Sequence, residues 1–306
     1  MEEKILYKIE QKDEKKRVDL VLSEYLKQYS RNYIQRLISE SFIKVNNHNV
    51  KTSYKVLAGD NIEIFIPKLV KETILPENIP IDIVYEDDDI LIVNKKQGMV
   101  VHPAAGNFTG TLVNALLYHC KTLSNINGEF RPGIVHRIDK DTSGILIITK
   151  NNKSHINIAK QLKDHLVRRK YIALTEGVIK VDKATINFPI GRHPINRKEM
   201  TVNIKNGRTA ITQFKVLKRY TKNTLIEVLL HTGRTHQIRV HMKHIGHPLV
   251  GDMVYGFKKQ KFKLGGQLLH AQELGFVHPT TGKYVDFEVE LPEYFIKVIE
   301  LLKSVN

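Results

Sequence analysis

Two segments that lie far apart in the chain carry side chains that could act together on a substrate. Segment 136–144 places Asp139 just before the apolar run 145–149. A buried strand anchors the loop in front of it, so we expect the carboxylate of Asp139 to lie on a rigid loop at the edge of a sheet. Segment 230–239 places Arg234 at a glycine turn between a strand and a helix. Arg234 is therefore expected at the sheet edge as well, where a carboxylate and a guanidinium can both be aimed at a substrate.

Two further segments could complete a site. Segment 98–106, which includes His102, is rich in glycine and small residues, and these let a backbone approach a ligand closely. By itself this segment fits a structural loop equally well. Segment 168–170 contributes three cations that we expect at the end of a helix, where they favour the helix dipole. Tyr171 follows at the start of a strand, and composition alone favours a place for it in the core.

The apolar periodicity predicts the elements that position these segments. Residues 81–85 and 90–93 predict a hairpin, and the acidic run 86–89 between them is expected to be a solvated turn rather than a metal site. Thr111 is expected to cap a helix that ends at His119. Further helices are expected at 152–166, 235–244 and 293–302, and further strands at 171–176, 184–189, 210–220, 224–231 and 284–291.

A separate small unit is expected at residues 17–66. Asp19 and Ser30 can each cap a helix, and the second helix turns Ile34, Leu37 and Ile38 inward. Short strands follow at 42–45 and 62–66, and prolines in 67–80 indicate a linker. Two helices and a small sheet with basic residues on one helix suit the phosphates of structured RNA.

The composition is that of a globular protein with a polyanionic partner. The chain has 306 residues, 42% of them hydrophobic, and a net charge of +16. Residues 151–306 hold 27 of the 48 basic and 12 of the 32 acidic residues. This uneven charge favours a nucleic acid as partner. Neither a membrane span nor a signal peptide is indicated, and Cys120, the single cysteine, is expected to pack against a helix, so we expect a cytoplasmic protein.

Residues 17–66 resemble the S4 RNA-binding domain, and the four segments described above resemble the RluA/RluD family of pseudouridine synthases across residues 76–306. The S4 resemblance rests on residues such as Arg17, Asp19, Ser30, Arg31 and Gly59. Together they imply an α+β protein: an S4-like domain at 1–70, a linker at 71–80, and a catalytic domain at 81–306 with a long, mostly antiparallel mixed sheet flanked by helices. They further imply a monomer that isomerises uridines in large-subunit ribosomal RNA without a cofactor or a metal.

The family resemblance also assigns roles to individual residues. Asp139 corresponds to the catalytic aspartate, Tyr171 to a tyrosine that stacks on the target base, and Arg234 to an arginine that pairs with the aspartate. Arg137 corresponds to the arginine that contacts the flipped-out nucleotide or fills its place. The other residues that we expect to contact RNA are Arg31, Arg36, His102, Arg168, Arg169, Lys170, His236 and Arg239.

Several alternatives stay open or are disfavoured. A metal site among the histidines between 231 and 247 lacks both the His-Glu-x-x-His spacing and cysteine partners. A serine hydrolase lacks the Gly-x-Ser-x-Gly turn. A ribosome-associated RNA-binding protein without catalysis would not need Asp139, Tyr171 and Arg234 together. The sequence leaves open whether the RNA is ribosomal or transfer RNA, and whether Asp139 acts as a nucleophile or through a glycal-type intermediate.

Overall fold

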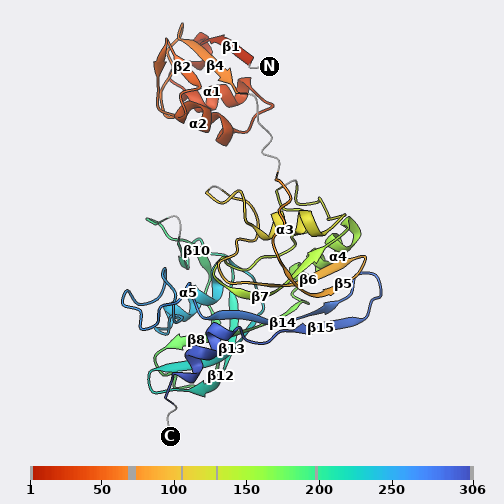
Figure 1. Ribbon diagram of the computed structural model, residues 1–306. Coiled ribbons are helices and arrows are strands. Elements are labelled where there is room, and N and C mark those ends of the chain that lie inside the picture. The colour runs from red at the N-terminus through yellow and green to blue at the C-terminus, as the bar shows by residue number, and fades with distance from the viewer. Residues whose placement is uncertain (1–2, 68–73, 105, 129, 197–198, 304–306) are drawn as a thin grey trace. The chain divides into compact units, whose positions relative to one another are not determined.

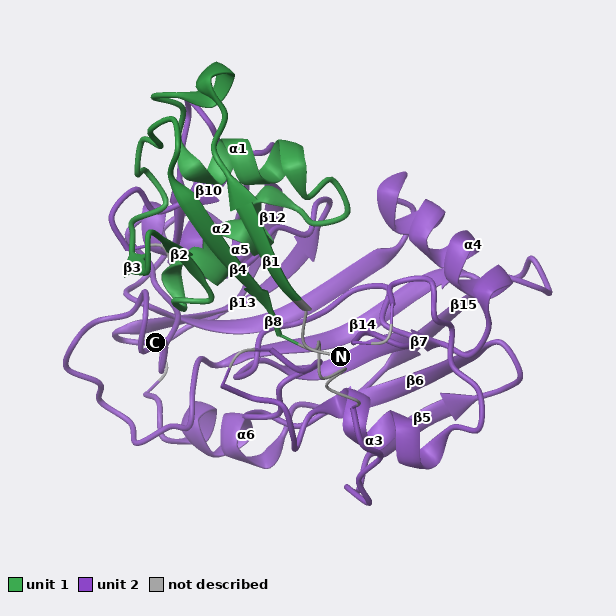
Figure 2. Ribbon diagram, turned by 90° about the horizontal axis from the view of Figure 1, so that it is seen from above, with its two compact units in different colours: residues 1–72 green, residues 73–306 purple. Residues whose placement is uncertain are grey.

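The computed structural model describes residues 3–67, 74–104, 106–128, 130–196 and 199–303. The chain divides into two compact units, Met1–Glu72 and Thr73–Asn306 (Figures 1 and 2). Residues 68–73 of the expected linker lie outside the described residues. Just beyond them, the carbonyl of Leu75 accepts a hydrogen bond from Asn114, and the amide of Glu77 donates one to the Asn114 carbonyl. This end of the expected linker therefore packs on the second unit.

The first unit is a small four-stranded antiparallel sheet with two helices. Ser30 accepts a hydrogen bond from the Tyr33 amide and caps the second helix, as expected, and Ile34, Leu37 and Ile38 are buried. The strand order is β1-β4-β2-β3. The elements are β1 (Glu3–Lys8), the 3-10 turn η1 (Gln11–Asp13), α1 (Val18–Tyr25), α2 (Arg31–Ser39), β2 (Ile43–Val45), β3 (His48–Asn49) and β4 (Asn61–Ile66).

Asp19 does not cap the first helix. Arg17 occupies the cap position and Asp19 lies in the first turn, where its fully buried carboxylate accepts hydrogen bonds from Arg17, Arg31 and Gln35. Burial alone would raise the pKa of Asp19, but these hydrogen bonds together lower it well below its usual range. Asp19 lies in α1, and two of its donors, Arg31 and Gln35, lie in α2. These hydrogen bonds therefore link the two helices.

The second unit is built on a nine-stranded mixed sheet with the order β5-β6-β7-β14-β8-β13-β12-β9, and β15 pairs with β14 (Figure 2). The pairing of β7 with β14 is parallel and the other pairings are antiparallel, as the family resemblance implied. Its strands are β5 (Asp82–Glu86), β6 (Ile90–Lys95), β7 (Ser143–Thr149), β8 (Arg168–Glu176), β9 (Lys183–Asn187), β12 (Ile211–Arg219), β13 (Asn223–Leu230), β14 (Leu269–Val277) and β15 (Tyr284–Glu288). A separate two-stranded sheet joins β10 (Ile190–Arg192) to β11 (Met200–Val202).

Helices cover both faces of the large sheet. α3 (Leu112–His119) and α5 (Gln237–His244) share one core with Leu146 and Ile148 of β7. α4 (Asn152–Lys163) packs on Ile145 and Ile147, which point to the opposite face because side chains alternate along a strand. α6 (Glu293–Glu300) packs on Ile172 and Leu174 of β8. The described part of the chain contains no helix long and apolar enough to cross a membrane.

Strand β14 was not expected from the sequence, although it lies between β7 and β8 near the middle of the sheet. His270, Gln272 and Glu273 interrupt its apolar pattern, and its register with β8 shifts between Ala271 and Glu273. A side chain at Gly144 would collide with the backbone of Ala271, so glycine is what lets β7 and β14 approach.

The helix expected at 152–166 ends at Lys163. His165 adopts a left-handed backbone with φ 59°, and Leu166 is exposed instead of packing with Ile158. Thr111 caps α3 in a reciprocal capping box with Asn114, as expected.

Candidate active site

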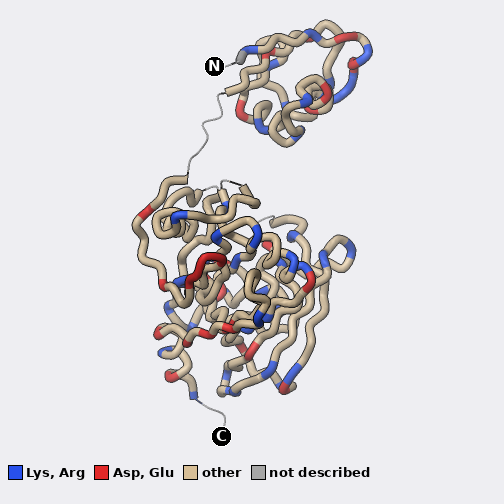
Figure 3. The backbone as a smooth tube through the Cα atoms, turned by 90° about the vertical axis from the view of Figure 1, so that its right-hand side faces the viewer, with Lys and Arg blue, Asp and Glu red and all other residues tan. Residues whose placement is uncertain are grey.

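A cavity of about 950 Å³ in the second unit collects most of the residues that the sequence singled out. Its wall is formed by the loop that follows Ile134, by the start of β8, and by the segment from Leu230 to Arg239. The expected site residues that line it are His102, Arg137, Asp139, Arg169, Tyr171, Arg234, His236 and Arg239. Seven basic and two acidic side chains line the cavity, and Lys and Arg occur throughout the unit (Figure 3). The cavity is therefore electropositive and suits a polyanion.

The loop that carries Asp139 is fixed by backbone hydrogen bonds. The Thr142 amide donates to the Asp139 carbonyl, and the Gly98 amide donates to the Lys140 carbonyl at 3.0 Å. Ile138 is buried in the core next to the aspartate. Gly98, at the start of segment 98–106, thus supports the loop of Asp139 from the side, which is a positioning role.

Lys95 at the end of β6 also anchors this loop. Its ammonium is almost fully buried and donates to the carbonyls of Lys96, Met99 and Lys140, each at 2.9 Å. Burial lowers the pKa of Lys95 to about 7, although the charges of Asp141 and Asp139 act in the opposite direction. No sequence motif pointed to this lysine, because its three partners are backbone atoms.

The carboxylate of Asp139 is held by Arg239, and not by Arg234 as the resemblance implied. Arg239 Nη1 donates to Asp139 Oδ2 at 2.9 Å, and its Nε and Nη2 grip both oxygens of Asp252 at 2.7 and 2.9 Å. Arg234 instead donates from Nε to the Thr209 carbonyl at 2.9 Å. The glycine turn directs Arg234 along the loop, whereas the first turn of α5 turns Arg239 inward.

Asp252 completes this ion-pair network. It is fully buried and also accepts the amides of Val254 and Tyr255, each at 2.9 Å. Burial alone would raise the pKa of Asp252, but Arg239 and the two amides keep it low. Burial would likewise lower the pKa of Arg239, but Asp252 and Asp139 raise it above its usual range. Arg239 therefore stays charged and presents one N–H to Asp139.

His236 lies on the other side of the aspartate. Its Nε2 is 3.9 Å from Asp139 Oδ1, and its Nδ1 shares a hydrogen bond with the Tyr255 hydroxyl at 2.8 Å. Burial lowers the pKa of His236 despite the charge of Asp139, so the ring is neutral near pH 7. The residue occupies the cap position of α5 with a left-handed backbone, φ 55°.

Tyr171 contributes an aromatic wall to the cavity. It is buried, and burial raises the pKa of its hydroxyl, so the phenol is neutral. The cations before it begin β8 rather than ending a helix. Because side chains alternate along a strand, Arg169 shares the cavity face with Tyr171. Arg168 and Lys170 point to the other face, where both pair with Glu273, so the structure does not bring these two to the cavity.

His102 and Arg137 line another part of the cavity wall. Burial, together with the charges of Arg131 and Arg137, lowers the pKa of His102 to about 4. Its Nδ1 is buried and has no hydrogen-bond partner within the described ranges. Arg137 is exposed and lines the cavity two residues before Asp139. Both are free to contact a ligand.

In the first unit, the two arginines expected to bind RNA have protein partners. Arg31 donates to Asp19, and Arg36 pairs with Glu40 on the exposed side of α2. The side chain of Arg31 keeps 45% of its surface exposed and that of Arg36 keeps 64%. Exposure at this level leaves both guanidinium groups accessible.

The sequence missed Lys95, Asp252 and Tyr255, and it gave Arg239 only an RNA-binding role. One signal was present for Arg239: it is a cation between the apolar residues Ile238 and Val240 in a predicted helix. The structure buries every residue from Gln237 to Met242. A buried cation in an apolar run needs an anionic partner. Asp252 carried no comparable local signal.

Three of the histidines considered for a metal, His236, His241 and His247, have hydrogen-bond partners in the protein. His241 bonds Thr212 and the Phe188 carbonyl, and His247 bonds the Glu176 carbonyl. The acidic turn 86–89 is also bonded rather than freely solvated, since Asp87 accepts two amides and His278.

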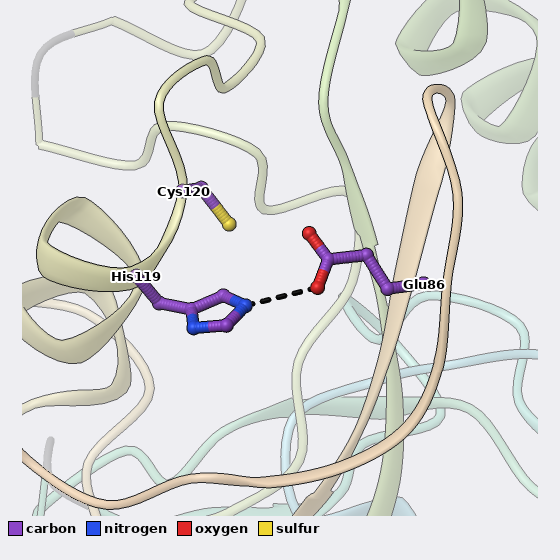
Figure 4. Close-up of side chains that lie close together, drawn as sticks. All are labelled: Glu86, His119 and Cys120. Carbon is purple, nitrogen blue, oxygen red and sulfur yellow. Dashed lines mark hydrogen bonds and ion pairs between the residues drawn. The ribbon is translucent and has the colours of Figure 1, made fainter.

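Glu86 lies beside His119 and Cys120, where a hydrogen bond of 2.9 Å joins the first two (Figure 4). Lys150 occupies the second oxygen of Glu86 at 2.9 Å. Burial and the charge of Glu86 raise the pKa of the Cys120 thiol to about 11, so without a metal the thiol is neutral near pH 7.

Each of the two units matches a known protein family in sequence. Residues 89–244 match the RNA pseudouridylate synthase family model, and residues 16–62 match the S4 domain. The chain is 49% identical to the RNA pseudouridine synthase YlyB of Bacillus subtilis over 96% of each chain. It is 41% identical to ribosomal large subunit pseudouridine synthase D of Zymomonas mobilis over 95% of each.

A solved structure of human RNA pseudouridylate synthase domain containing 1 has the same fold. It matches with a TM-score of 0.57 at 23% identity, covering 75% of this chain and 98% of that one. The matches in sequence extend over both units, and the fold agrees with them. The chain therefore belongs to the RNA pseudouridine synthases, a family of isomerases, and carries an S4 domain in front of its synthase unit.

Proposed function

We propose that this pseudouridine synthase modifies uridines of large-subunit ribosomal RNA, with Asp139 as its catalytic group. The observation that carries the proposal is the position of the Asp139 carboxylate, which lies in the wall of an electropositive cavity, gripped by Arg239, on the same cavity as Tyr171. The relatives named as ribosomal large subunit synthases support the choice of RNA. Such an enzyme acts where ribosomes are assembled, which places it in the cytoplasm, and one chain suffices for the site.

The cavity suits a nucleotide that has left its stack. A uridine within folded RNA hides its glycosidic bond, and swinging it out costs a few kcal/mol. Tyr171 offers a ring against which the base can stack, worth ~1–3 kcal/mol. Arg137, exposed at the cavity, is placed to contact the displaced nucleotide or to fill its gap.

The reaction is an isomerisation in which no atom is lost. The bond from ribose C1′ to N1 breaks, the uracil turns, C5 bonds to C1′, and the proton on C5 moves to N1 by way of solvent or a side chain. Arg239 holds Asp139 and orients it toward the substrate, and it does so at every pH at which RNA is stable because an arginine stays charged there. Neither oxidation nor reduction occurs, so the reaction requires no redox cofactor.

The proposal is tested with unmodified RNA labelled with tritium at C5 of uridine. The purified full chain should release tritium from a large-subunit ribosomal RNA transcript, and carbodiimide mapping should find pseudouridine at a few positions. A transfer RNA transcript of equal uridine content should release little. Release from transfer RNA alone would contradict the ribosomal assignment, and release from neither RNA would contradict the proposed activity on these substrates.

A further inference from the structure

Arg169 is a buried cation without a counter-ion. Only 8% of the residue is exposed, and it lines the cavity. Its Nη2 donates to the carbonyls of His231 and Leu230 at 3.2 and 3.5 Å. Its Nε is buried and has no hydrogen-bond partner in the described part of the chain. The guanidinium therefore has donors to spare and faces no carboxylate among the ion pairs of the described residues.

A charge in such surroundings is costly. Moving an ion out of water without an opposite charge is among the most unfavourable events in folding, and an arginine does not escape it by losing its proton. Burial lowers the pKa of Arg169, and the one neighbour that opposes this is the phenol of Tyr171. Arg239 in the same cavity has two carboxylates. Arg169 is thus one half of an ion pair whose other half, an anion, is not among its partners in the described part of the chain.

The position of Arg169 indicates which anion this is. Arg169 and Tyr171 lie two residues apart on the same face of β8, so their Cα atoms are separated by ~6.6 Å along the strand. A base stacked on Tyr171 keeps its own sugar and phosphate at about this distance. The guanidinium also lies against Gly233, where a Cβ would approach Nη1 to 2.7 Å, so the absence of a side chain there makes room for it.

We propose that Arg169 is the phosphate-binding group of the cavity and holds a phosphate of the nucleotide whose base lies on Tyr171. This inference rests on the proposed function and adds a subsite to it. The planar fork of an arginine matches two phosphate oxygens, and the pairing supplies the charge that the cavity lacks. The neutral uracil ring has no charge to offer, so it cannot take the place of the phosphate.

The test compares uridine with its 3′- and 5′-monophosphates as ligands of the full chain, measured by titration calorimetry. A charge-assisted contact in a buried site predicts that at least one monophosphate binds about tenfold or more tightly than uridine. Arg169→Met should reduce this ratio to less than about threefold. Arg169→Lys, which keeps the charge but loses the fork, should give an intermediate ratio.

Arg219→Met is the matched control. Arg219 also donates to two backbone carbonyls, those of Ile179 and Lys180, but it has a counter-ion in Asp182 and lies outside the cavity lining. This variant should keep the wild-type ratio. A merely structural role for Arg169 would lower the thermal midpoint in Arg169→Met without changing the preference for the monophosphate.

Two results would overturn the inference. One is a wild-type protein that binds neither monophosphate more tightly than uridine; the other is an Arg169→Met variant, folded by circular dichroism, that keeps the full preference. Binding is measured without turnover. The titration therefore tests the phosphate subsite even when the RNA transcripts release no tritium. Failure of the proposed function and failure of the phosphate subsite are therefore separate outcomes.

Discussion

At the scale of single residues, the site depends on one arginine that binds two carboxylates. Arg239 orients Asp139 with one N–H and is itself oriented by Asp252. Asp252 is buried, does not line the cavity, and acts only through Arg239. A carboxylate held in this way has little freedom to rotate, which is what positioning a group for reaction requires.

Exchanging the two arginines of this region one at a time separates their roles. Arg239→Lys keeps the charge but cannot grip both aspartates, so we expect kcat to fall about 100-fold, the usual cost of a misplaced reactive group. Arg234→Lys loses one hydrogen bond to the Thr209 carbonyl and should cost far less in kcat. Tritium release at saturating RNA measures both. A larger loss of kcat in Arg234→Lys than in Arg239→Lys would favour the pairing of Arg234 with Asp139 that the family resemblance implied.

His136 makes the second unit sensitive to acid. Its Nε2 accepts the amide of Ile147 at 3.1 Å, and burial together with the charge of Arg169 lowers its pKa to about 3. In the unfolded chain a histidine titrates near pH 6.5, so the unfolded state binds the extra proton first. The stability contributed by this depressed pKa is complete above about pH 6.5 and is lost as the pH falls toward 3.

Urea unfolding between pH 7.5 and 4.5 measures this dependence. In His136→Gln, the amide oxygen can still accept from Ile147 but does not titrate, so the free energy of unfolding should fall less steeply with acid. Identical slopes for the variant and the wild type would show that His136 is not the group responsible.

At the scale of elements, the aspartate loop is held by the end of β6 as much as by β7. Lys95 reaches three carbonyls, one of them in the loop itself at Lys140. Lys95→Met would leave these carbonyls buried without a donor, at about 1–3 kcal/mol for each group. We therefore expect a loss of at least about 3 kcal/mol in the free energy of unfolding, together with a fall in kcat. A stable variant with normal kcat would contradict the anchoring role.

The elements that the sequence predicts well are those with a local signal. Thr111 and Ser30 cap helices because their hydroxyls reach backbone amides three residues on, and this pattern is visible in the sequence. Strand β14 escaped prediction because its polar residues hide the alternation and its partners are distant in sequence. The pairing of Arg239 with Asp139 escaped prediction for the same reason, since the two residues are 100 positions apart.

At the scale of the whole molecule, the S4 domain and the synthase unit have separate cores. Removing residues 1–72 retains Leu75 and Glu77, which pack on the synthase unit, so the remaining chain keeps its own contacts. We expect this truncation to weaken RNA affinity while kcat at saturating RNA changes little, because phosphate contacts contribute affinity rather than chemistry. Unchanged affinity, measured by filter binding at fixed salt, would contradict an RNA-binding role for the S4 domain.

The central claim is that one carboxylate, Asp139, performs the chemistry. Asp139→Asn keeps the size of the side chain and can still meet Arg239 through its amide oxygen, so the fold and RNA binding should be retained. The measurement is tritium release from 5-tritiated ribosomal RNA under single-turnover conditions, with RNA affinity measured in parallel. The account predicts no release above background and wild-type affinity within about threefold. Release by Asp139→Asn at a rate near that of the wild type would contradict it.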